Sequence, residues 1–199
     1  MFLGLEFTLI MLIYRFSSTI CNHTWLRDDN LTLSTPQKVL KLAVVGAGGV
    51  GKSTLISRIV TGAFLDKSMT VGFDVESWTL STNGDGAIKV CLFDFGGQKQ
   101  FRFFQGSLIM GAKAALIVFD CNSFKSLMQI GEWMDLIAAI PREKTLLVGN
   151  KTDIGQTIAC EEIQEYANEY GIDHILVSSK TGDNFDTLLE RVTEMISDA

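Results

Sequence analysis

From residue 39 onward the sequence alternates short apolar runs with stretches whose apolar positions recur at helical spacing. This alternation is typical of βαβ units arranged around a mostly parallel sheet. The apolar, β-rich runs predict strands at 39–45, 74–81, 88–93, 114–120, 145–150 and 174–177. The helical spacing predicts helices at 52–61, in a region after Gln98, and at 123–139, 160–170 and 185–197.

The second and third predicted strands are joined by Asn83-Gly84-Asp85-Gly86, which is rich in turn-forming residues. This link is too short for a helical crossover, so the two strands should form an antiparallel hairpin. The expected fold class is therefore α/β, with a six-stranded, mixed but mostly parallel sheet and helices on both of its faces.

Residues 1–37 do not share this pattern. An apolar run over 1–16 is followed by a polar stretch, and no globular pattern covers either part, which leaves disorder open. The run is shorter than the ~20 residues of a spanning helix and lacks a basic start and a clear cleavage site, which argues against a signal peptide. Three interpretations stay open: an interfacial membrane anchor, a helix packed on the domain, or translated upstream sequence with the true start at Met11 or later. We expect one domain over 38–199, preceded by this N-terminal extension.

The charge balance argues against a nucleic-acid-binding protein. The 17 basic and 23 acidic residues give a net charge of −6, whereas nucleic-acid backbones attract clustered Lys and Arg. Any bound phosphate must therefore be held by local structure. The four cysteines occur singly, without a C-x-x-C pair, so neither a zinc site nor a disulfide framework is indicated and reduced thiols are expected.

A phosphate-binding motif follows the first predicted strand directly and leads into a predicted helix. The segment Gly46-Ala47-Gly48-Gly49-Val50-Gly51-Lys52-Ser53 matches G-x-x-x-x-G-K-[ST] at every fixed position. Its glycines let the backbone curl so that successive N–H groups point inward, and the helix adds the positive end of its dipole. Lys52 can reach the outer phosphates of a nucleotide, and the Ser53 hydroxyl is a hard oxygen suited to Mg²⁺.

A second motif, D-x-x-G, is formed by Asp94-Phe95-Gly96-Gly97 at the end of the third predicted strand. Open α/β sheets present their ligand-binding groups at the carboxyl ends of strands. Asp94 is therefore placed to hold Mg²⁺ through a water, and the Gly97 N–H can meet a terminal phosphate oxygen. Loss of that phosphate would release the segment that follows.

The segment Asn150-Lys151-Thr152-Asp153 follows the fifth predicted strand and resembles the N-K-x-D guanine motif. The Asp153 carboxylate can accept hydrogen bonds from N1–H and the N2 amine of guanine. Adenine lacks this donor pair, and a site built around a polar partner rejects an analogue without it. Asn150 would tie loops together, and the stem of Lys151 would lie along the face of the base.

Ser178-Ser179-Lys180 follows the sixth predicted strand and matches an S-A-K type loop, in which the backbone N–H at Ser179 can contact guanine O6. Together with the preceding motifs, it gives residues 38–199 a resemblance to the Ras superfamily of small GTPases. The resemblance implies a P-loop NTPase G domain that binds GTP or GDP with Mg²⁺. It also implies that the protein hydrolyses GTP, as a conformational switch in signalling or vesicle trafficking.

Within this resemblance, Thr70-Val71-Gly72-Phe73-Asp74 is similar to the switch I segment of the Rab and Ras branches. Thr70 would then place its hydroxyl on Mg²⁺ and its N–H near the γ-phosphate. The alternative for Thr70 is an ordinary threonine at the start of a strand. Phe64 would stack on the guanine, although the stretch between Phe64 and Thr70 is slightly short.

Gly96-Gly97-Gln98 is closer to the Arf branch, where Gly-Gly-Gln replaces Ala-Gly-Gln, so no branch is assigned. Gln98 stands where the family positions its attacking water, and Gly48 where a side chain would crowd the transition state. Both favour hydrolysis, but the absence of an obvious arginine beside the γ-phosphate predicts a slow rate and help from a partner's arginine. Effector, exchange-factor and GTPase-activating proteins would bind through the loops near Thr70 and Gln98.

Two other functional classes stay open: a guanine-nucleotide-binding scaffold that hardly turns GTP over, and an ATP-using P-loop enzyme. Residues 194–199 contain no cysteine for prenylation, and Phe2 excludes N-myristoylation. We therefore expect a cytoplasmic protein without a C-terminal prenyl anchor. A peripheral membrane position would depend on residues 1–37 or on a partner.

The predicted site residues share one proposed role, which is to hold a guanine nucleotide and its metal ion. The catalytic candidates are Lys52, Thr70 and Gln98, and the metal candidates are Ser53, Thr70 and Asp94. The nucleotide-binding candidates are Gly46, Gly48, Gly49, Val50, Gly51, Lys52, Ser53, Thr54, Phe64, Thr70, Asp94, Gly97, Asn150, Lys151, Asp153, Ser178, Ser179 and Lys180.

Overall fold

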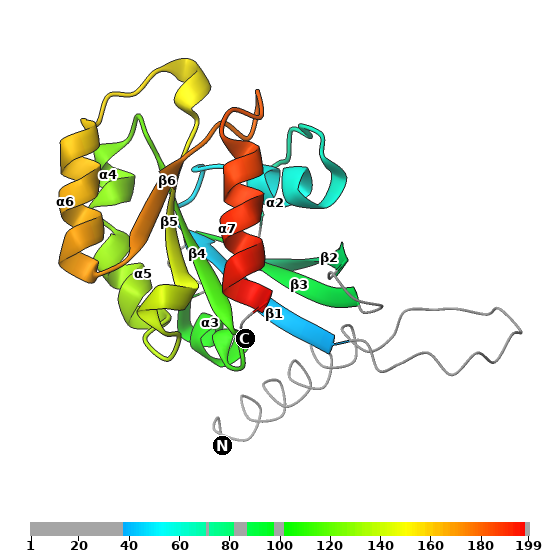
Figure 1. The fold of residues 1–199 in the computed structure, drawn as a ribbon. Coiled ribbons are helices and arrows are strands. Elements are labelled where there is room, and N and C mark those ends of the chain that lie inside the picture. Colours follow the sequence, from blue (N-terminus) through cyan, green and yellow to red (C-terminus); the bar gives the residue numbers. More distant parts are fainter. Residues whose placement is uncertain (1–37, 71, 82–86, 98–101, 198–199) are drawn as a thin grey trace, which may run out of the picture.

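The computed structural model describes residues 38–70, 72–81, 87–97 and 102–197 (Figure 1). The N-terminal extension lies outside the described residues, so its three interpretations stay predictions. Gln98 lies outside them as well. The described part of the chain carries the sheet, the helices that cover it and the loops that bear the predicted motifs.

The described strands form one six-stranded sheet in the order β2-β3-β1-β4-β5-β6. All neighbouring strands run parallel except β2 and β3, which are antiparallel. The mixed, mostly parallel sheet predicted from the sequence is therefore confirmed. The strands are β1 (Lys38–Gly46), β2 (Phe73–Ser81), β3 (Ala87–Phe95), β4 (Ala114–Asp120), β5 (Thr145–Asn150) and β6 (Asp173–Leu176).

The predicted hairpin is confirmed by the register of β2 and β3, in which Asp74 lies opposite Asp94 and Phe73 opposite Phe95. This pairing carries β3 two residues beyond the predicted end at Phe93. The segment 82–86 that links the two strands lies outside the described residues. The register brings the start of β2, three residues after Thr70, beside the end of β3 that carries Asp94.

Helices cover both faces of the sheet, as predicted (Figure 1). Buried side chains of α2 and α7 pack on one face, and those of α3, α4, α5 and α6 pack on the other. Two short 3₁₀ turns, η2 (Arg142–Lys144) and η3 (Thr152–Ile154), lie in the loops around β5. The helices are α2 (Lys52–Thr61), α3 (Arg102–Ile109), α4 (Phe124–Leu127), α5 (Ile130–Leu136), α6 (Cys160–Tyr170) and α7 (Phe185–Ser197).

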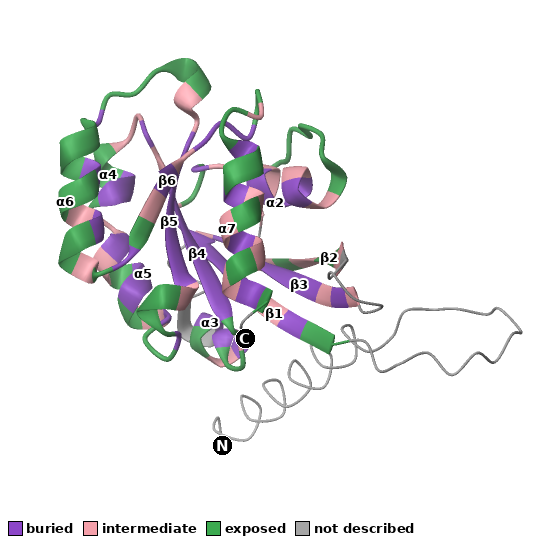
Figure 2. Ribbon diagram, in the orientation of Figure 1, coloured by how far each residue is buried: buried purple, intermediate pink, exposed green. Residues whose placement is uncertain are grey.

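The central strands are buried between these two helical layers (Figure 2). In β1 the side chains of Leu42 and Val44 pack toward α2 and α7, whereas those of Ala43 and Val45 pack toward the opposite layer. β5 is buried at every position. A strand covered on both faces reads as a continuous apolar run, which is why the sequence marked these strands clearly.

The single helix predicted at 123–139 is wrong, because the structure has two short helices there, α4 and α5. The Ser126 hydroxyl donates to the Ser123 carbonyl at 2.7 Å and accepts from the Asp120 N–H at 3.0 Å. Such side-chain to backbone bonds compete with a continuous helical ladder. β6 also ends at Leu176, one residue earlier than predicted.

The expectation of reduced thiols holds for Cys121 and Cys160, which are free. It is wrong for Cys91, which is disulfide-bonded. Within the described ranges, no helix is both long and apolar enough to cross a bilayer.

Candidate functional site

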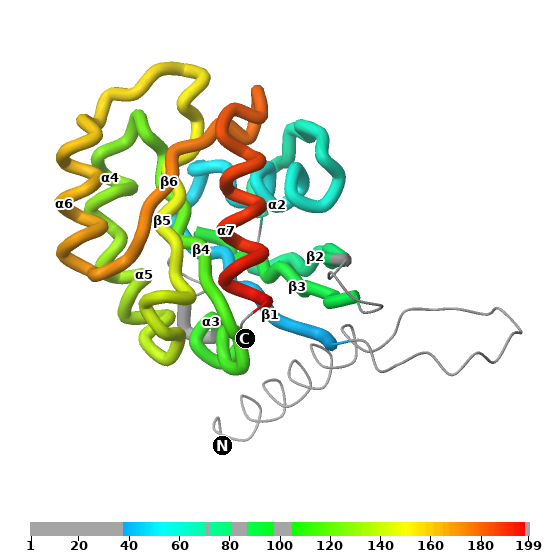
Figure 3. Tube along the Cα trace, in the orientation of Figure 1, coloured from blue at the N-terminus to red at the C-terminus, as the bar shows by residue number. Residues whose placement is uncertain are grey.

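The loops that follow β1, β5 and β6 gather at one edge of the sheet, where these parallel strands end (Figure 3). A cleft of about 460 Å³ lies there. Ligand sites of open α/β sheets occupy this position. The cleft is lined by Gly48, Gly49, Gly51, Lys52, Ser53, Thr54, Phe64, Asp66, Lys67, Ser68, Met69, Thr70, Gly96, Gly97, Asn150, Lys151, Asp153, Ile154, Ser179 and Lys180.

Most of the predicted nucleotide-binding residues line this cleft, and the rest lie directly behind it. Gly46, Val50, Asp94 and Ser178 do not line the cleft but bond or pack against residues that do. The prediction did not include Asp66, Lys67, Ser68, Met69, Gly96 and Ile154, which also line it. In the sequence, these six residues lie between or beside predicted site residues, and this position was the signal that could have identified them.

The loop between β1 and α2 curls as its glycines predict. Gly46, Gly49 and Gly51 have φ angles of 145°, 79° and 94°, in the left-handed region that residues with a Cβ rarely adopt. A Cβ on Gly46 would also lie 2.1 Å from the carbonyl oxygen of Val118 in β4. Only glycine therefore allows the loop to turn this closely above the sheet, and such a turn is the conformation from which backbone N–H groups bind anions.

Lys52 lies inside this loop and is 6% exposed. Its ammonium donates to the carbonyl oxygens of Gly46 at 3.0 Å and Ala47 at 2.8 Å. Burial lowers the pKa of Lys52 to about 8, although the nearby Asp94 carboxylate opposes this shift. A negatively charged group in the cleft would stabilise the charged form of Lys52 that burial disfavours, so the site favours an anion.

Three side-chain oxygens converge beside Lys52 from three separate segments. The Ser53 hydroxyl from α2 lies 2.7 Å from the Thr70 hydroxyl, and it also donates to Oδ2 of Asp94 at the end of β3. Thr70 donates to the same carboxylate oxygen at 3.1 Å. Hydroxyl and carboxylate oxygens are the ligands that Mg²⁺ takes in nucleotide sites.

The Asp94 carboxylate supplies a direct test of whether a metal ion fits. It is 4% exposed, and its Oδ1 atom has no hydrogen-bond partner among the described residues. Burial raises the pKa of Asp94, against the lowering effects of Ser53, Lys52 and Thr70. A buried carboxylate with an unpartnered oxygen is costly unless a cation pairs with it, so the residues present fit Mg²⁺.

The D-x-x-G segment packs directly on the phosphate loop. A Cβ on Gly97 would lie 2.1 Å from the Gly48 nitrogen, so a larger residue would displace one of the two loops. The preceding Gly96 donates its N–H to the Gly72 carbonyl at 2.9 Å. Its own carbonyl accepts a 2.8 Å bond from the fully buried Gln105 side chain of α3, which the sequence did not single out. Bonds through Gly96 therefore connect α3 to the segment around Thr70.

At the other end of the cleft, Asn150 joins the phosphate loop to the loop after β6. Its amide nitrogen donates to the Val50 carbonyl at 3.0 Å. Its amide oxygen accepts from the Ser179 N–H at 3.0 Å and the Ser179 hydroxyl at 2.9 Å. The N–H that was predicted to contact guanine O6 therefore already donates to Asn150, and contact with a base would share this donor.

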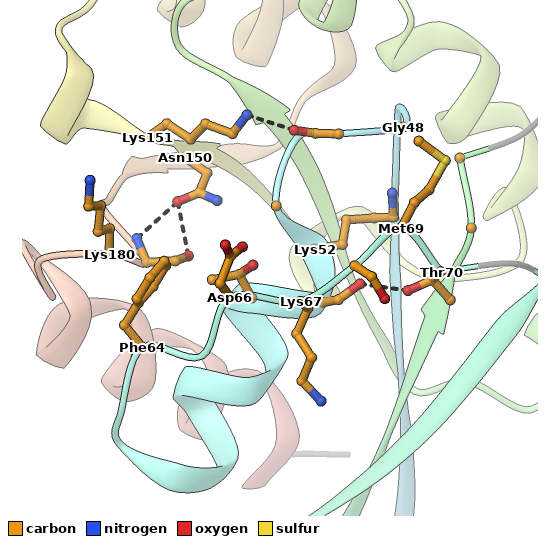
Figure 4. A pocket seen from close by; sticks show the side chains of 18 of the residues that line it. Gly48, Lys52, Phe64, Asp66, Lys67, Met69, Thr70, Asn150, Lys151 and Lys180 are labelled. Carbon is orange, nitrogen blue, oxygen red and sulfur yellow. Dashed lines mark hydrogen bonds between the residues drawn. The ribbon is translucent and has the colours of Figure 1, made fainter.

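Lys151 crosses the cleft from the end of β5 (Figure 4). Its ammonium donates to the Gly49 carbonyl at 2.6 Å and pairs with the Asp120 carboxylate at 2.9 Å. Asp120 was missed by the sequence analysis, although its place at the end of β4 repeats that of Asp94 at the end of β3. The pair holds the lysine stem along one wall of the cleft.

Asp153 is held by the Ser178 hydroxyl, which donates to its Oδ1 atom at 2.7 Å. The same hydroxyl accepts the N–H groups of Lys180 at 3.2 Å and Thr181 at 3.0 Å. Phe64 and Lys180 lie on the side of the cleft that holds Asn150, and Thr70 lies at the opposite end (Figure 4). The cleft therefore separates an end with the chemistry for phosphate and metal from an end with the chemistry for a base.

The chain is similar to known proteins over most of its length. The sequence model of the Ras family matches residues 41–198. The Ras-related protein Rab-1D of Dictyostelium discoideum is 33% identical over 151 residues, which cover 73% of this chain and 74% of that protein. The GTP-binding protein YPTM2 of Zea mays is 31% identical over 165 residues, 80% of this chain and 81% of its own. The Ras-related protein Rab5 of Nicotiana tabacum is 31% identical over 161 residues, which cover 78% of this chain and 80% of that protein.

Proposed function

Because this chain belongs to the Ras family of small GTPases, we propose that it binds Mg²⁺·GTP and hydrolyses it to GDP and phosphate as a conformational switch in signalling or vesicle trafficking. The observation that carries the proposal is the convergence of the Ser53, Thr70 and Asp94 oxygens beside Lys52. The Asp94 oxygen for which the described residues supply no partner supports a metal ion at this point.

In this proposal Lys52 turns its ammonium from the loop carbonyls to the outer phosphates, and the loop amides hold the remaining phosphate oxygens. Ser53, Thr70 and Asp94 would hold Mg²⁺, Asp94 through a water. Held by these residues, the metal ion would supply positive charge that stabilises the charge developing on the phosphates. Thr70 thereby couples the segment before β2 to the presence of the γ-phosphate.

Guanine selectivity is assigned to Asp153, whose carboxylate would accept N1–H and the N2 amine. Ser178 holds that carboxylate in place through its 2.7 Å hydrogen bond. The Lys151 stem and the half-exposed Phe64 ring line the cleft and would pack against the two faces of the base. Adenine cannot supply the two donors that Asp153 needs.

For hydrolysis we assign the positioning of the attacking water to Gln98, which lies outside the described residues. An added Cβ on Gly48 meets no atom of the described residues within 4 Å, so on their side the space beside this residue is open to the substrate and water. Catalysis of this reaction depends on positioning and electrostatic stabilisation. The absence of an obvious arginine by the γ-phosphate in the sequence leads us to propose a slow intrinsic rate, raised by a partner.

Effectors, exchange factors and GTPase-activating proteins are proposed to bind through the loops near Thr70 and Gln98. Two apolar side chains before Thr70 support this surface, because Leu65 is 46% and Met69 67% exposed. Exposed apolar groups on a loop that responds to the nucleotide suit a partner that reads its state. We propose a cytoplasmic protein that visits membranes peripherally.

Competition between GTP and ATP for the purified protein tests the nucleotide assignment. We expect GTP to displace a fluorescent GDP analogue at concentrations at least about 10⁴-fold lower than ATP. A site that hydrogen-bonds its substrate rejects an analogue without those donors by about this factor. Equal affinity would defeat the role of Asp153 and favour an ATP-using P-loop enzyme.

Single-turnover release of phosphate from bound GTP separates a switch from a scaffold that holds GTP without hydrolysis. We expect measurable release by the unmodified protein and much slower release by the Gln98→Leu variant. Equal rates for the two proteins would remove Gln98 from the mechanism.

A further inference from the structure

Arg58 of α2 contacts the loop after β6 from outside the cleft. Its Nη1 atom donates to the carbonyl oxygens of Ser179 at 3.1 Å and Lys180 at 3.2 Å. Its Nη2 atom donates to the Thr181 carbonyl at 3.4 Å. One guanidinium group therefore binds three successive carbonyls of the loop that ends the base side of the cleft.

The same loop is held from inside the cleft by residues that belong to the predicted base site. Asn150 binds the N–H and hydroxyl of Ser179, and Ser178 binds the N–H groups of Lys180 and Thr181. The N–H groups of the loop are thus bonded on one side and its carbonyls on the other. Removing Arg58 would leave the inner set of bonds and the loop's own backbone bonds, from the Ser178 N–H to the Asp183 carbonyl and from the Gly182 N–H to the Ser178 carbonyl.

The surroundings of Arg58 are shaped to keep the guanidinium in place. It lies over the ring of Phe185 with its Cζ atom 5.3 Å from the ring centre. Gly182 also lies against the guanidinium, because an added Cβ there would be 2.1 Å from Nη2, and its φ of 88° favours glycine. The planar fork of arginine binds several acceptors in a fixed geometry, which a lysine ammonium cannot reproduce.

We propose that Arg58 is a positioning residue for guanine selectivity. It holds the Ser179–Thr181 carbonyls so that the loop presents the Ser179 N–H to the base and, through Ser178, keeps the Asp153 carboxylate in place. Ser178 transmits this effect, because it bonds both the loop N–H groups and the Asp153 carboxylate. Arg58 stands on the helix that begins with Lys52 and Ser53, so it also ties the base end of the cleft to the phosphate end. This inference rests on the proposed guanine-nucleotide function.

The test compares the affinities of GDP and ADP, which share ribose and phosphates, so that their ratio reports only the reading of the base. In Arg58→Met we expect the preference for GDP over ADP to fall roughly tenfold, while the ADP affinity stays unchanged. This is the size of effect expected when hydrogen bonds from a charged group are lost. Arg58→Lys should recover part of this preference. It keeps the charge and serves as the second variant if Arg58→Met does not fold.

Arg191→Met is the matched control, because Arg191 of α7 also donates to a backbone carbonyl, that of His174 at 3.0 Å, away from the cleft. It should leave the preference unchanged even if it lowers the melting temperature. An unchanged GDP to ADP ratio in both Arg58 variants, or an equal loss of both affinities, overturns the proposal. Equal binding of GDP and ADP by the unmodified protein instead overturns the guanine assignment itself.

Discussion

At the scale of single residues, the site depends on groups that are buried without a full set of partners. Among the residues that the structure describes, the Lys52 ammonium donates only to two loop carbonyls, and one oxygen of Asp94 has no hydrogen-bond partner. Both groups gain from a ligand of the opposite charge, since burial disfavours their ionised forms. If the proposed function holds, we expect the binding of phosphate and of metal to depend on each other.

The lowered pKa of Lys52 predicts how GDP affinity depends on pH. The pKa is about 8 in the free protein, and bound phosphates raise it, so above pH 8 binding must take up a proton. We expect a nearly constant GDP affinity between about pH 7 and 8, where the phosphates of GDP are already ionised. Above about pH 8 we expect the GDP affinity to decline by up to about tenfold per pH unit. Titration with a fluorescent GDP analogue across this range measures the effect.

Lys41 provides the control for this pH dependence. Burial also lowers its pKa to about 8, but its ammonium bonds the carbonyls of Leu108 and Met110 at the end of α3. Lys41→Met should keep the pH dependence of GDP affinity, whereas Lys52→Met should lose it together with most of the affinity. A GDP affinity that stays constant to about pH 9.5 in the unmodified protein would contradict the role of Lys52.

Gly48→Val is predicted to separate folding from hydrolysis. A Cβ at this position meets no described atom within 4 Å, so the variant should keep its melting temperature and bind GDP. The valine would occupy the space of the substrate and its attacking water, and we expect hydrolysis to slow by about tenfold or more. Single-turnover phosphate release measures this change, and an unaltered rate would show that the space beside Gly48 is not used.

At the scale of elements, the site is held together by loops that bond to one another across the ends of the strands. Gly96 links the end of β3 to Gly72 before β2 and to Gln105 of α3. Its lack of a Cβ permits this contact, because an added Cβ would lie 2.9 Å from the Thr70 carbonyl and 3.0 Å from that of Gly72. The metal candidates Thr70 and Asp94 are therefore kept together by this close approach.

Gly96→Ala is predicted to weaken Mg²⁺ binding more than nucleotide binding. The added methyl group would push Thr70 away from Asp94, and we expect Mg²⁺ affinity to fall roughly threefold to tenfold, the value of one hydrogen bond. The rate of GDP release, measured at increasing Mg²⁺ concentrations, gives the Mg²⁺ affinity of each variant. Gly106→Ala in α3, where an added Cβ meets no atom within 4 Å, is the control and should leave these rates unchanged. Identical Mg²⁺ dependence in both variants would argue against the Gly96 contact.

At the scale of the whole molecule, segments from most of the described chain meet in one cleft. Residues from α2, the loop before β2 and the loops after β3, β5 and β6 line it. A ligand that contacts all of them binds the folded state alone, so it stabilises the entire domain. Nucleotide exchange and domain stability should therefore change together.

Removal of Mg²⁺ and nucleotide is predicted to lower the melting temperature. A ligand at 100 times its dissociation constant contributes about 2.7 kcal/mol of stability, which is lost on removal. Calorimetry of the protein with GDP and Mg²⁺, and after chelation and dialysis, measures this loss. GDP should restore the melting temperature and ADP should not, while a melting temperature indifferent to GDP would contradict binding in the cleft.

Much of the fold and of the phosphate site could be predicted from the sequence because the relevant signals are local. The bounds of α2, β4 and β5 were predicted correctly, since continuous apolar runs mark the two strands, and helical spacing between Gly51 and Gly62 marks α2. The curl around Gly49 and Gly51 follows from residues that sit in it. The break between α4 and α5 was not predictable in this way, because it accompanies bonds from the Ser126 side chain to Ser123 and Asp120.

By itself, the sequence determined the strand and helix pattern, the phosphate loop and the residue types that suit phosphate, metal and guanine. Only the tertiary structure decided that Asn150 bonds Val50, a hundred positions earlier, and that Arg58 bonds the carbonyls after Ser178. The physical reason is that a local pattern fixes backbone conformation near each residue. Contacts between distant segments depend instead on the order of strands in the sheet, which brings the carboxyl ends of β1, β5 and β6 to the same edge.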